Sequence, residues 1–291
     1  MSRPSMTQFN YEAAFSRNLG WTTEEEQQSL RESRVAIAGM GGVGGAHLLT
    51  LTRLGVGHFH IADFDSFGVE NTNRQAGARV STYGKKKADT LQQMALDINP
   101  ELDIKVFGEG VNRQNVEQFF SKVDIYVDGL DFFAFDAREL VFHHCHLHSI
   151  PAITAAPLGT GAATLAFMPK RMSFEQYFGF KGQTELEKAL RFFVGLAPSM
   201  AHASYLVDPS RVDLSEQKGP STIMGCEVCA GVAATQVLKI LTGRGRILPA
   251  PHGLQYDPFI NTVKHTWRPG GYRNPLTRFV MNRVRQAFLA N

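Results

Sequence analysis

A run of glycines between an apolar segment and a helical one constrains this chain more than any other feature. Residues 35–38 read Val-Ala-Ile-Ala, which predicts a short buried strand. Residues 44–54 predict a helix that ends at Gly55. The glycines between them are Gly39, Gly41, Gly42 and Gly44. They let the backbone approach phosphate oxygens, and the helix start offers unpaired N–H groups. The pattern predicts a nucleotide site without saying which nucleotide.

Composition excludes several classes of protein. The chain has 291 residues, is 43% hydrophobic and 20% charged, and carries a net charge of +3. This is the balance of a globular protein, and it gives no reason to expect a nucleic acid or a membrane as partner. Three cysteines argue against a disulfide framework. We find no apolar run of the roughly 18–20 residues that span a membrane and no signal-peptide pattern at the start, so we expect a cytoplasmic protein.

Strand and helix patterns alternate through the first half of the chain. The expected strands are 35–38, 59–62, 104–107, 125–127 and 150–154, and the main helices are 44–54, 84–98 and 137–148. This order predicts an α/β, Rossmann-like fold, with a mainly parallel sheet and helices on both faces.

We divide the chain into a helical segment (1–33), a nucleotide-binding domain (34–169) and a smaller region that completes the same domain (170–291). In that last region we expect a crossover loop with one helix at 185–195, a long helix at 225–241 and terminal strands.

Two acidic residues follow the second strand. Asp63 lies about 20 residues past the glycines, where an acid accepts hydrogen bonds from a ribose. Asp65 lies two residues further on, so its side chain would be on the same face of the sheet as that of Asp63 if the strand continued.

The polar residues after these acids favour ATP over a dinucleotide. Arg74 can bind phosphate oxygens with its guanidinium fork, and Asn71 or Asn73 can donate without adding charge. Lys87 opens the next helix and supplies a second cation, whereas Lys85 and Lys86 would point elsewhere. An NAD-dependent oxidoreductase, which stays an alternative, would use the glycines and Asp63 but would give Arg74 and Lys87 nothing to bind.

Asp128 and Asp131 follow the strand at 125–127. Loops at the carboxyl ends of parallel strands line the ligand crevice, and a carboxylate there suits Mg²⁺ on a phosphate chain. We assign the Mg²⁺ to Asp131 and expect Asp128 to bind backbone groups.

In the order and spacing of these motifs, residues 15–167 resemble the adenylating domain of the MoeB/ThiF/HesA family, relatives of the ubiquitin-activating enzymes. The shared motifs are Gly-x-Gly-Gly-x-Gly from Gly39, Asp-x-Asp from Asp63, Asn71-Thr-Asn73-Arg74-Gln75, Gly84-x-x-Lys87 and Asp131. The resemblance implies Mg·ATP binding, attack of a carboxylate on the α-phosphate and release of pyrophosphate. The acyl substrate would be the C-terminus of a ubiquitin-like or sulfur-carrier protein, a peptide or a small carboxylate.

The resemblance also implies a homodimer in which an N-terminal arginine reaches the partner's nucleotide site. Phe15-Ser16-Arg17-Asn18 matches that segment, so Arg17 takes this role. Within the family, a tRNA threonylcarbamoyladenosine dehydratase is a close alternative because it shares Asn-Thr-Asn-Arg-Gln. The near-neutral charge gives no support for tRNA. A non-catalytic nucleotide-binding partner protein is the remaining alternative.

The cysteines depart from the family pattern. Familiar members bind zinc through two Cys-x-x-Cys pairs, whereas Cys226-Glu-Val-Cys229 stands alone here and positions 168–170 hold no cysteine. We therefore do not expect zinc, although Cys145 and a histidine could join the pair. Cys226 could form a thioester with the acyl group, or it could be a buried structural thiol. We favour the structural interpretation. The histidines at 143, 144, 146 and 148 are interpreted as ordinary helix residues.

Overall fold

The computed structural model describes residues 8–212 and 219–289, and their strands form one mixed sheet of eight. The strand order is β3-β2-β1-β4-β5-β6-β7-β8. The strands are β1 (Arg34–Ala38), β2 (His58–Ala62), β3 (Asp103–Phe107), β4 (Ile125–Asp128), β5 (Ala152–Leu158), β6 (Gly161–Phe167), β7 (His252–Asp257) and β8 (Thr262–Trp267). The first five run parallel, and β6 to β8 continue the sheet as an antiparallel meander.

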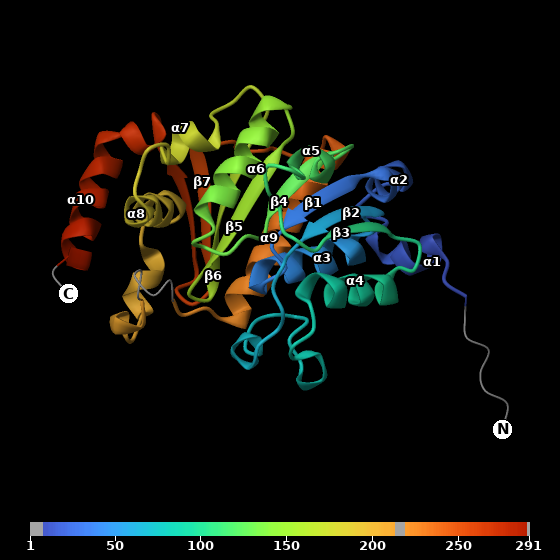
Figure 1. Ribbon diagram of the computed structural model, residues 1–291. Coiled ribbons are helices and arrows are strands. Elements are labelled where there is room, and N and C mark those ends of the chain that lie inside the picture. The colour runs from blue at the N-terminus through green and yellow to red at the C-terminus, as the bar shows by residue number, and fades with distance from the viewer. Residues whose placement is uncertain (1–7, 213–218, 290–291) are drawn as a thin grey trace.

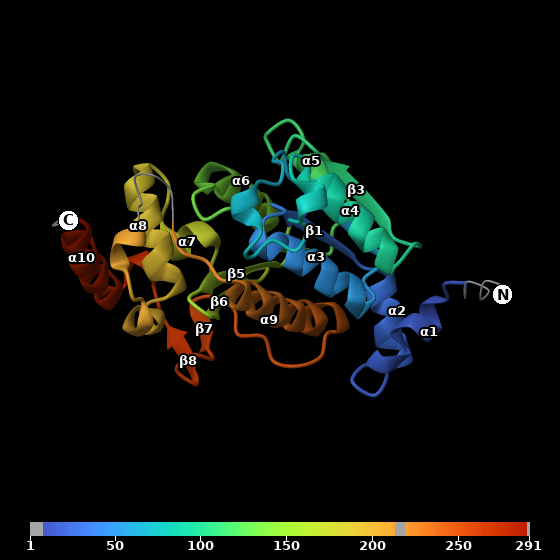
Figure 2. The same cartoon turned by 90° about the horizontal axis from the view of Figure 1, so that it is seen from below.

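Helices cover both faces of the sheet (Figures 1 and 2). One face carries α3 (Gly42–Leu54), α4 (Lys87–Ile98) and α9 (Ile223–Thr242). The other carries α5 (Val116–Phe119), α6 (Phe135–Leu147), α7 (Phe174–Phe178) and α8 (Glu185–Leu196), with α10 (Pro275–Leu289) packed on α8. Each face has its own apolar core, as expected when both sides of a parallel sheet are covered. The predicted Rossmann-like fold is confirmed.

The sheet topology brings several loops to one edge. Because β1, β2, β4 and β5 run parallel, the residues after them (Gly39, Asp63, Gly129 and Gly159) lie along the same carboxyl edge. β7 runs in the same direction as β5, since two antiparallel pairings separate them, so Asp257 ends at this edge too. All the predicted ligand-binding motifs except Arg17 belong to loops or helix starts at this edge.

The N-terminal segment, α1 (Tyr11–Phe15) and α2 (Glu24–Glu32), packs at the opposite end of α3. Asn18 Nδ2 donates to the Leu54 carbonyl oxygen at 3.0 Å, and Tyr11 Oη donates to that of Gly55 at 2.6 Å. Thr23 and Glu26 form the capping box that starts α2. These contacts anchor the segment to the C-terminal end of α3.

Two local predictions were wrong. The helix expected from residue 84 starts at Lys87, because Gly84 has a positive φ of 79° and Lys86 is extended. The short helix α7 was missed within 170–222, although Ser173 and Gln176 form a capping box that starts it. Its isolated aromatic residues, Phe174, Tyr177 and Phe178, are buried in the core beside α6 and α8.

Among the described residues, α9 is long and apolar enough to cross a membrane by length and composition alone, whereas we expected no such run. In the fold it packs against α3 and against the β5–β6 hairpin. Its buried side chains include Cys229, Ala233 and Val237. A core helix of this kind meets the same criteria as a membrane span.

The pH dependence of folding should carry a contribution from His47 on α3. Its ring is buried, neither nitrogen has a hydrogen-bond partner among the described residues, and burial lowers its pKa to about 4 despite nearby Asp128. In the unfolded chain a histidine takes up a proton below about pH 6.5, whereas His47 in the folded chain stays neutral down to about pH 4. His47 therefore leaves the free energy of unfolding unchanged above pH 6.5 and lowers it progressively as the pH falls from 6.5 to about 4.

Between pH 7.5 and pH 5, we therefore expect the free energy of unfolding of the wild type to fall by about 2 kcal/mol more than that of His47→Met. Urea unfolding of both proteins at the two pH values measures this difference. Equal losses in wild type and variant would contradict the assignment.

Candidate nucleotide site

The glycine loop brings three backbone segments unusually close together. Gly39 has a positive φ of 87°, and a Cβ there would overlap the Gly129 carbonyl oxygen. A Cβ at Gly44 would overlap the carbonyl oxygen of Gly39. Gly41 is the N-cap of α3 and has no side chain to bind the amides of the first turn. Those N–H groups, with the positive end of the helix dipole, are available to an anion.

Asp63 holds the glycine loop against the end of β2. Its Oδ2 accepts from the Met40 amide at 2.6 Å, and its Oδ1 accepts from the Asp65 amide at 2.7 Å. The strand stops at Ala62, so a turn rather than a continuing pleat orients Asp65. A carboxylate oxygen has more than one acceptor site, so Asp63 can still accept from a ligand.

Lys87 lies at the first position of α4 and is buried. Its Nζ is 3.1 Å from Asp65 Oδ2, and its amide donates to the Asp65 carbonyl oxygen at 3.0 Å. Lys86 Nζ instead donates to the Phe64 carbonyl oxygen at 2.6 Å, and Lys85 is exposed. The structure therefore fixes the ammonium group of Lys87, whereas Lys85 and Lys86 lie elsewhere, and its role toward a ligand stays a prediction.

Arg74 lies beside the start of α3. A Cβ on Gly42 would be 3.5 Å from Arg74 Cγ, so the aliphatic part of Arg74 covers the glycine loop. Its Nη1 donates to the Glu70 carbonyl oxygen at 3.1 Å and to Asn73 Oδ1 at 3.0 Å. Asn73 Nδ2 in turn donates to the Ser221 carbonyl oxygen at 2.9 Å, which ties this segment to the start of α9.

The two other polar side chains of this segment have different surroundings. Asn71 is buried and accepts from the Gly68 amide at 2.9 Å, so it shapes the turn. Gln75 had no role in the sequence prediction beyond its place in the motif. It is buried, its Oε1 has no partner among the described residues, and its Nε2 lies 3.8 Å from a Cβ built on Gly41. Gln75 thus presents an unused acceptor beside the glycine loop.

The loop after β4 is built on a buried ion pair that sequence reasoning missed. Asp128 Oδ2 accepts from Arg138 Nε at 2.9 Å and from Thr154 Oγ1 at 2.9 Å. Arg138 also donates to the carbonyl oxygens of Leu130 and Asp131, both at 2.9 Å. Asp128 was expected to bind backbone groups, and it does accept from the Leu130 amide at 3.2 Å, but its main partner is this arginine.

Asp131 is the exposed acid of this loop. Its Oδ1 accepts from the Phe133 amide at 3.0 Å, while Arg138 holds its backbone. An exposed carboxylate at the carboxyl edge, on a loop whose backbone Arg138 binds, suits a hard cation such as Mg²⁺.

Arg17 lies outside this constellation. It is exposed in a short 3₁₀ helix, Ser16–Asn18, next to the Asn18 side chain that binds the C-terminal end of α3. The glycine loop is at the other end of that helix. Arg17 therefore does not join the nucleotide site of its own chain.

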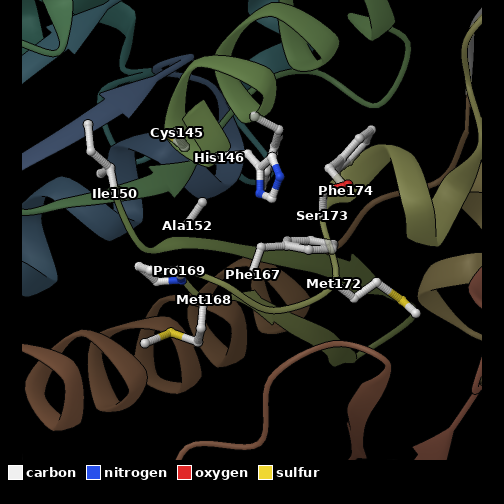
Figure 3. A pocket seen from close by; sticks show the side chains of 11 residues that line it. Cys145, His146, Ile150, Ala152, Phe167, Met168, Pro169, Met172, Ser173 and Phe174 are labelled. Atoms are coloured by element: carbon white, nitrogen blue, oxygen red, sulfur yellow. The ribbon is translucent and has the colours of Figure 1, made fainter. Parts of the chain in front are cut away.

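The cysteines do not form a metal site within the described residues. Cys145 and Cys229 belong to the cores on opposite faces of the sheet. Positions 168 and 169, near which familiar family members have a cysteine pair, hold Met168 and Pro169 here. Figure 3 shows these two residues lining a pocket with Phe167 and Met172, while Cys145 and His146 come from α6.

Cys226 is buried beside the glycine loop, where a Cβ on Gly42 would be 2.9 Å from its Sγ. Burial raises the pKa of its thiol, although Ser221 and Arg74 act in the other direction. A thiol of raised pKa is a poor nucleophile, which favours the structural interpretation over a thioester.

A glycine loop at a helix start, with an arginine, a lysine and a carboxylate at the same sheet edge, is typical of proteins with a Rossmann-like fold that bind nucleotides. The ThiF family model matches residues 15–276. The chain belongs to the ThiF family.

Curated relatives carry several activities. The chain is 35% identical over 133 residues to the tRNA threonylcarbamoyladenosine dehydratase of Bacillus subtilis (46% of this chain, 50% of that protein). It is 28% identical over 232 residues to the probable adenylyltransferase/sulfurtransferase MoeZ of Mycobacterium tuberculosis (76% and 51%). It is 27% identical over 143 residues to the ThiS adenylyltransferase of Escherichia coli (49% and 56%). The chain thus spans about half the length of the curated relatives it matches.

Solved structures share the fold at low identity. E. coli MccB with ATP superposes with a TM-score of 0.65 at 20% identity, covering 94% of this chain and 75% of that one. PaaA gives 0.66 at 18% identity, covering 92% and 77%.

The Asp128–Arg138 pair generates a stability prediction. Arg138→Met would leave a buried carboxylate without its charge partner, so we expect the free energy of unfolding to fall by about 3–5 kcal/mol. Chemical denaturation measures it, and Arg53→Met on the exposed face of α3 is the matched control. A loss no larger than that of the control would show that the pair does not stabilise the loop.

Proposed function

We propose that this protein is an ATP-dependent adenylyltransferase that activates a carboxylate as an acyl-adenylate. The observation that carries the proposal is the convergence of Arg74, Lys87 and the N-terminus of α3 at one sheet edge. The likeness to adenylyltransferases such as MoeZ and the ThiS enzyme supports it. Reaction of one anion with another requires a site that offsets negative charge, and this edge supplies two fixed cations and a helix dipole.

The residues at the edge fit Mg·ATP. The uncapped first turn of α3 offers amides to phosphate oxygens, and no side chain on Gly41 or Gly42 blocks their approach. Gln75 Oε1 adds a buried acceptor that has no partner in the part of the chain that the structure describes, which suits a polar ligand group. Bound Mg·ATP would supply the electrophilic phosphorus and a pyrophosphate leaving group.

Each residue then has a role that follows from its anchoring. Arg74, fixed through Nη1, would direct the rest of its guanidinium to phosphate oxygens. Lys87 has three hydrogens on Nζ, so it can bind Asp65 and a phosphate oxygen together. Asp63 would accept from the ribose, and Asp131 would hold Mg²⁺. Asn71 and Asn73 position Arg74 through the turn and through Ser221.

The acyl substrate would reach this edge beside the start of α9. Thr222 Oγ1 donates to the Gly159 carbonyl oxygen at 2.6 Å, and Asn73 binds Ser221, so the α9 start links the nucleotide loops to the β5–β6 turn. The relatives' names mention ThiS and threonylcarbamoyladenosine in tRNA, and solved structures of MccB contain MccA. We infer a protein, peptide or small carboxylate as substrate, a homodimer as the working form and a cytoplasmic location.

A dehydratase of threonylcarbamoyladenosine in tRNA is the second candidate. It is favoured by the 35% identity to the Bacillus subtilis enzyme. It would use the same activation step, so the two candidates differ in the acyl substrate. An NAD-dependent oxidoreductase gains no support, because it does not need Arg74 beside the glycine loop or the buried Lys87 beside Asp65.

Exchange of labelled pyrophosphate into ATP tests the proposal. The probes are ThiS as a sulfur-carrier protein, a short peptide ending in a free carboxylate, and tRNA carrying threonylcarbamoyladenosine. We expect exchange with one of them. Arg74→Ala or Asp131→Ala should reduce it by about 10²–10³-fold, because each removes charge stabilisation from the reacting centre.

Lys85→Ala is the matched control, since Lys85 is exposed beside the buried Lys87 and should leave exchange unchanged. Exchange with modified tRNA alone would select the dehydratase. ATP binding without exchange against any probe would favour a non-catalytic partner protein. Tight NADH binding without ATP binding would contradict the proposal.

Complementation tests whether Arg17 acts across a dimer. Arg17→Ala and Arg74→Ala should each be inactive alone. An equal mixture, unfolded and refolded together, should regain about a quarter of wild-type exchange, because half the dimers are mixed and half their sites are intact. No recovery in mixtures shown by mass to contain heterodimers would exclude this role.

A further inference from the structure

Two histidines and a glutamate meet on the helical face opposite α3 and α9. His144 lies in the last turn of α6, and His148 is the C-cap of that helix. Their rings stack with centroids 4.2 Å apart and planes inclined by 23°. Glu117 comes from α5, and its Oε1 is 3.7 Å from His144 Nδ1. A separation of four residues places the two histidines on one side of the helix, and the fold adds the carboxylate from another element.

We propose that Glu117, His144 and His148 bind a divalent transition-metal ion. One nitrogen from each histidine and one carboxylate oxygen lie within 4.8 Å of one another. Three points so spaced lie within about 2.8 Å of a common point, and zinc binds nitrogen and carboxylate oxygen at about 2.0–2.2 Å. Rotation of the exposed side chains of Glu117 and His148 would bring their donor atoms to such a distance from His144, with the His148 ring turning out of its stack so that both imidazole lone pairs face the ion.

The surroundings of these side chains suit a metal ion. A Phe120 ring stacks on His144 at 4.7 Å and holds the buried imidazole close to Glu117. A metal ion would satisfy the carboxylate and both imidazoles together.

The donor set selects the kind of metal. Two imidazole nitrogens exclude Mg²⁺ and Ca²⁺ as preferred ions, since these take oxygen ligands. Imidazole with a carboxylate suits Zn²⁺ and its neighbours. The Glu117 side chain is 77% exposed and His148 is exposed, which leaves room for water at a fourth position. The site resembles a three-ligand zinc centre open to solvent rather than a closed cysteine site.

The ion would join α5 to α6. The short helix α5 belongs to the connection between β3 and β4, and it packs on α6. The ligands lie at the C-terminal end of α6, whereas the Asp131 loop precedes its N-terminal end. We therefore assign the metal a stabilising role, separate from the nucleotide site, and its test does not depend on the proposed adenylation.

Zinc titration of the full chain, freed of metal by chelation, tests the proposal. A competing chromophoric chelator reports the affinity. We expect Glu117→Gln and His148→Gln each to weaken one zinc site by at least about tenfold, as loss of even an outer-shell partner does elsewhere. Both residues are exposed, so both variants should fold. His146→Gln, an exposed histidine on the same helix, is the matched control and should bind like wild type.

Thermal unfolding provides an independent readout. Zinc should raise the melting temperature of wild type and of His146→Gln by equal amounts and that of Glu117→Gln by less, and millimolar Mg²⁺ should not substitute. Absence of zinc binding by the wild type, or equal binding by all variants, would overturn the proposal.

Discussion

The rest of the structure depends on a close backbone contact at the glycine loop. Gly39, Gly44 and Gly129 meet where a Cβ on any of them would overlap a carbonyl group or a neighbouring Cα. The contact lets α3 start directly at the end of β1 and lie against the end of β4. It thereby aims the uncapped turn of α3 at the carboxyl edge, where the loops after β2 and β5 also arrive. Larger residues would push the helix off the sheet and separate the groups that form the site.

The charged groups at this edge are fixed in advance by contacts within the chain. Lys87 is held by Asp65, Arg74 by two acceptors in its own loop, and the backbone of Asp131 by buried Arg138. Such anchoring matters because a site whose dipoles are already oriented pays no reorganisation when charge develops. The acid that binds the glycine loop, Asp63, links the first two strands to this set. A surface of mobile lysines would have similar net charge without this order.

Local sequence patterns predicted most of the fold, and they supplied the candidate residues of the site. Apolar runs located the strands of the parallel half, and Gly55 marked the end of α3 correctly. The start of α4 was missed because Gly84 adopts a left-handed turn that helix propensity does not reveal. Arg138 was missed because one arginine in a helix reads as solvated, and only the fold buries it against Asp128. Gln75 and Glu117 gain meaning from neighbours distant in sequence, which spacing within one segment cannot supply.

A crystal structure with Mg²⁺ and a non-hydrolysable ATP analogue tests the account most directly. It should show the phosphate chain over the first turn of α3, with the Arg74 guanidinium and the Lys87 ammonium within hydrogen-bond distance of phosphate oxygens. An analogue bound at full occupancy with both groups turned away from its phosphates would contradict the account.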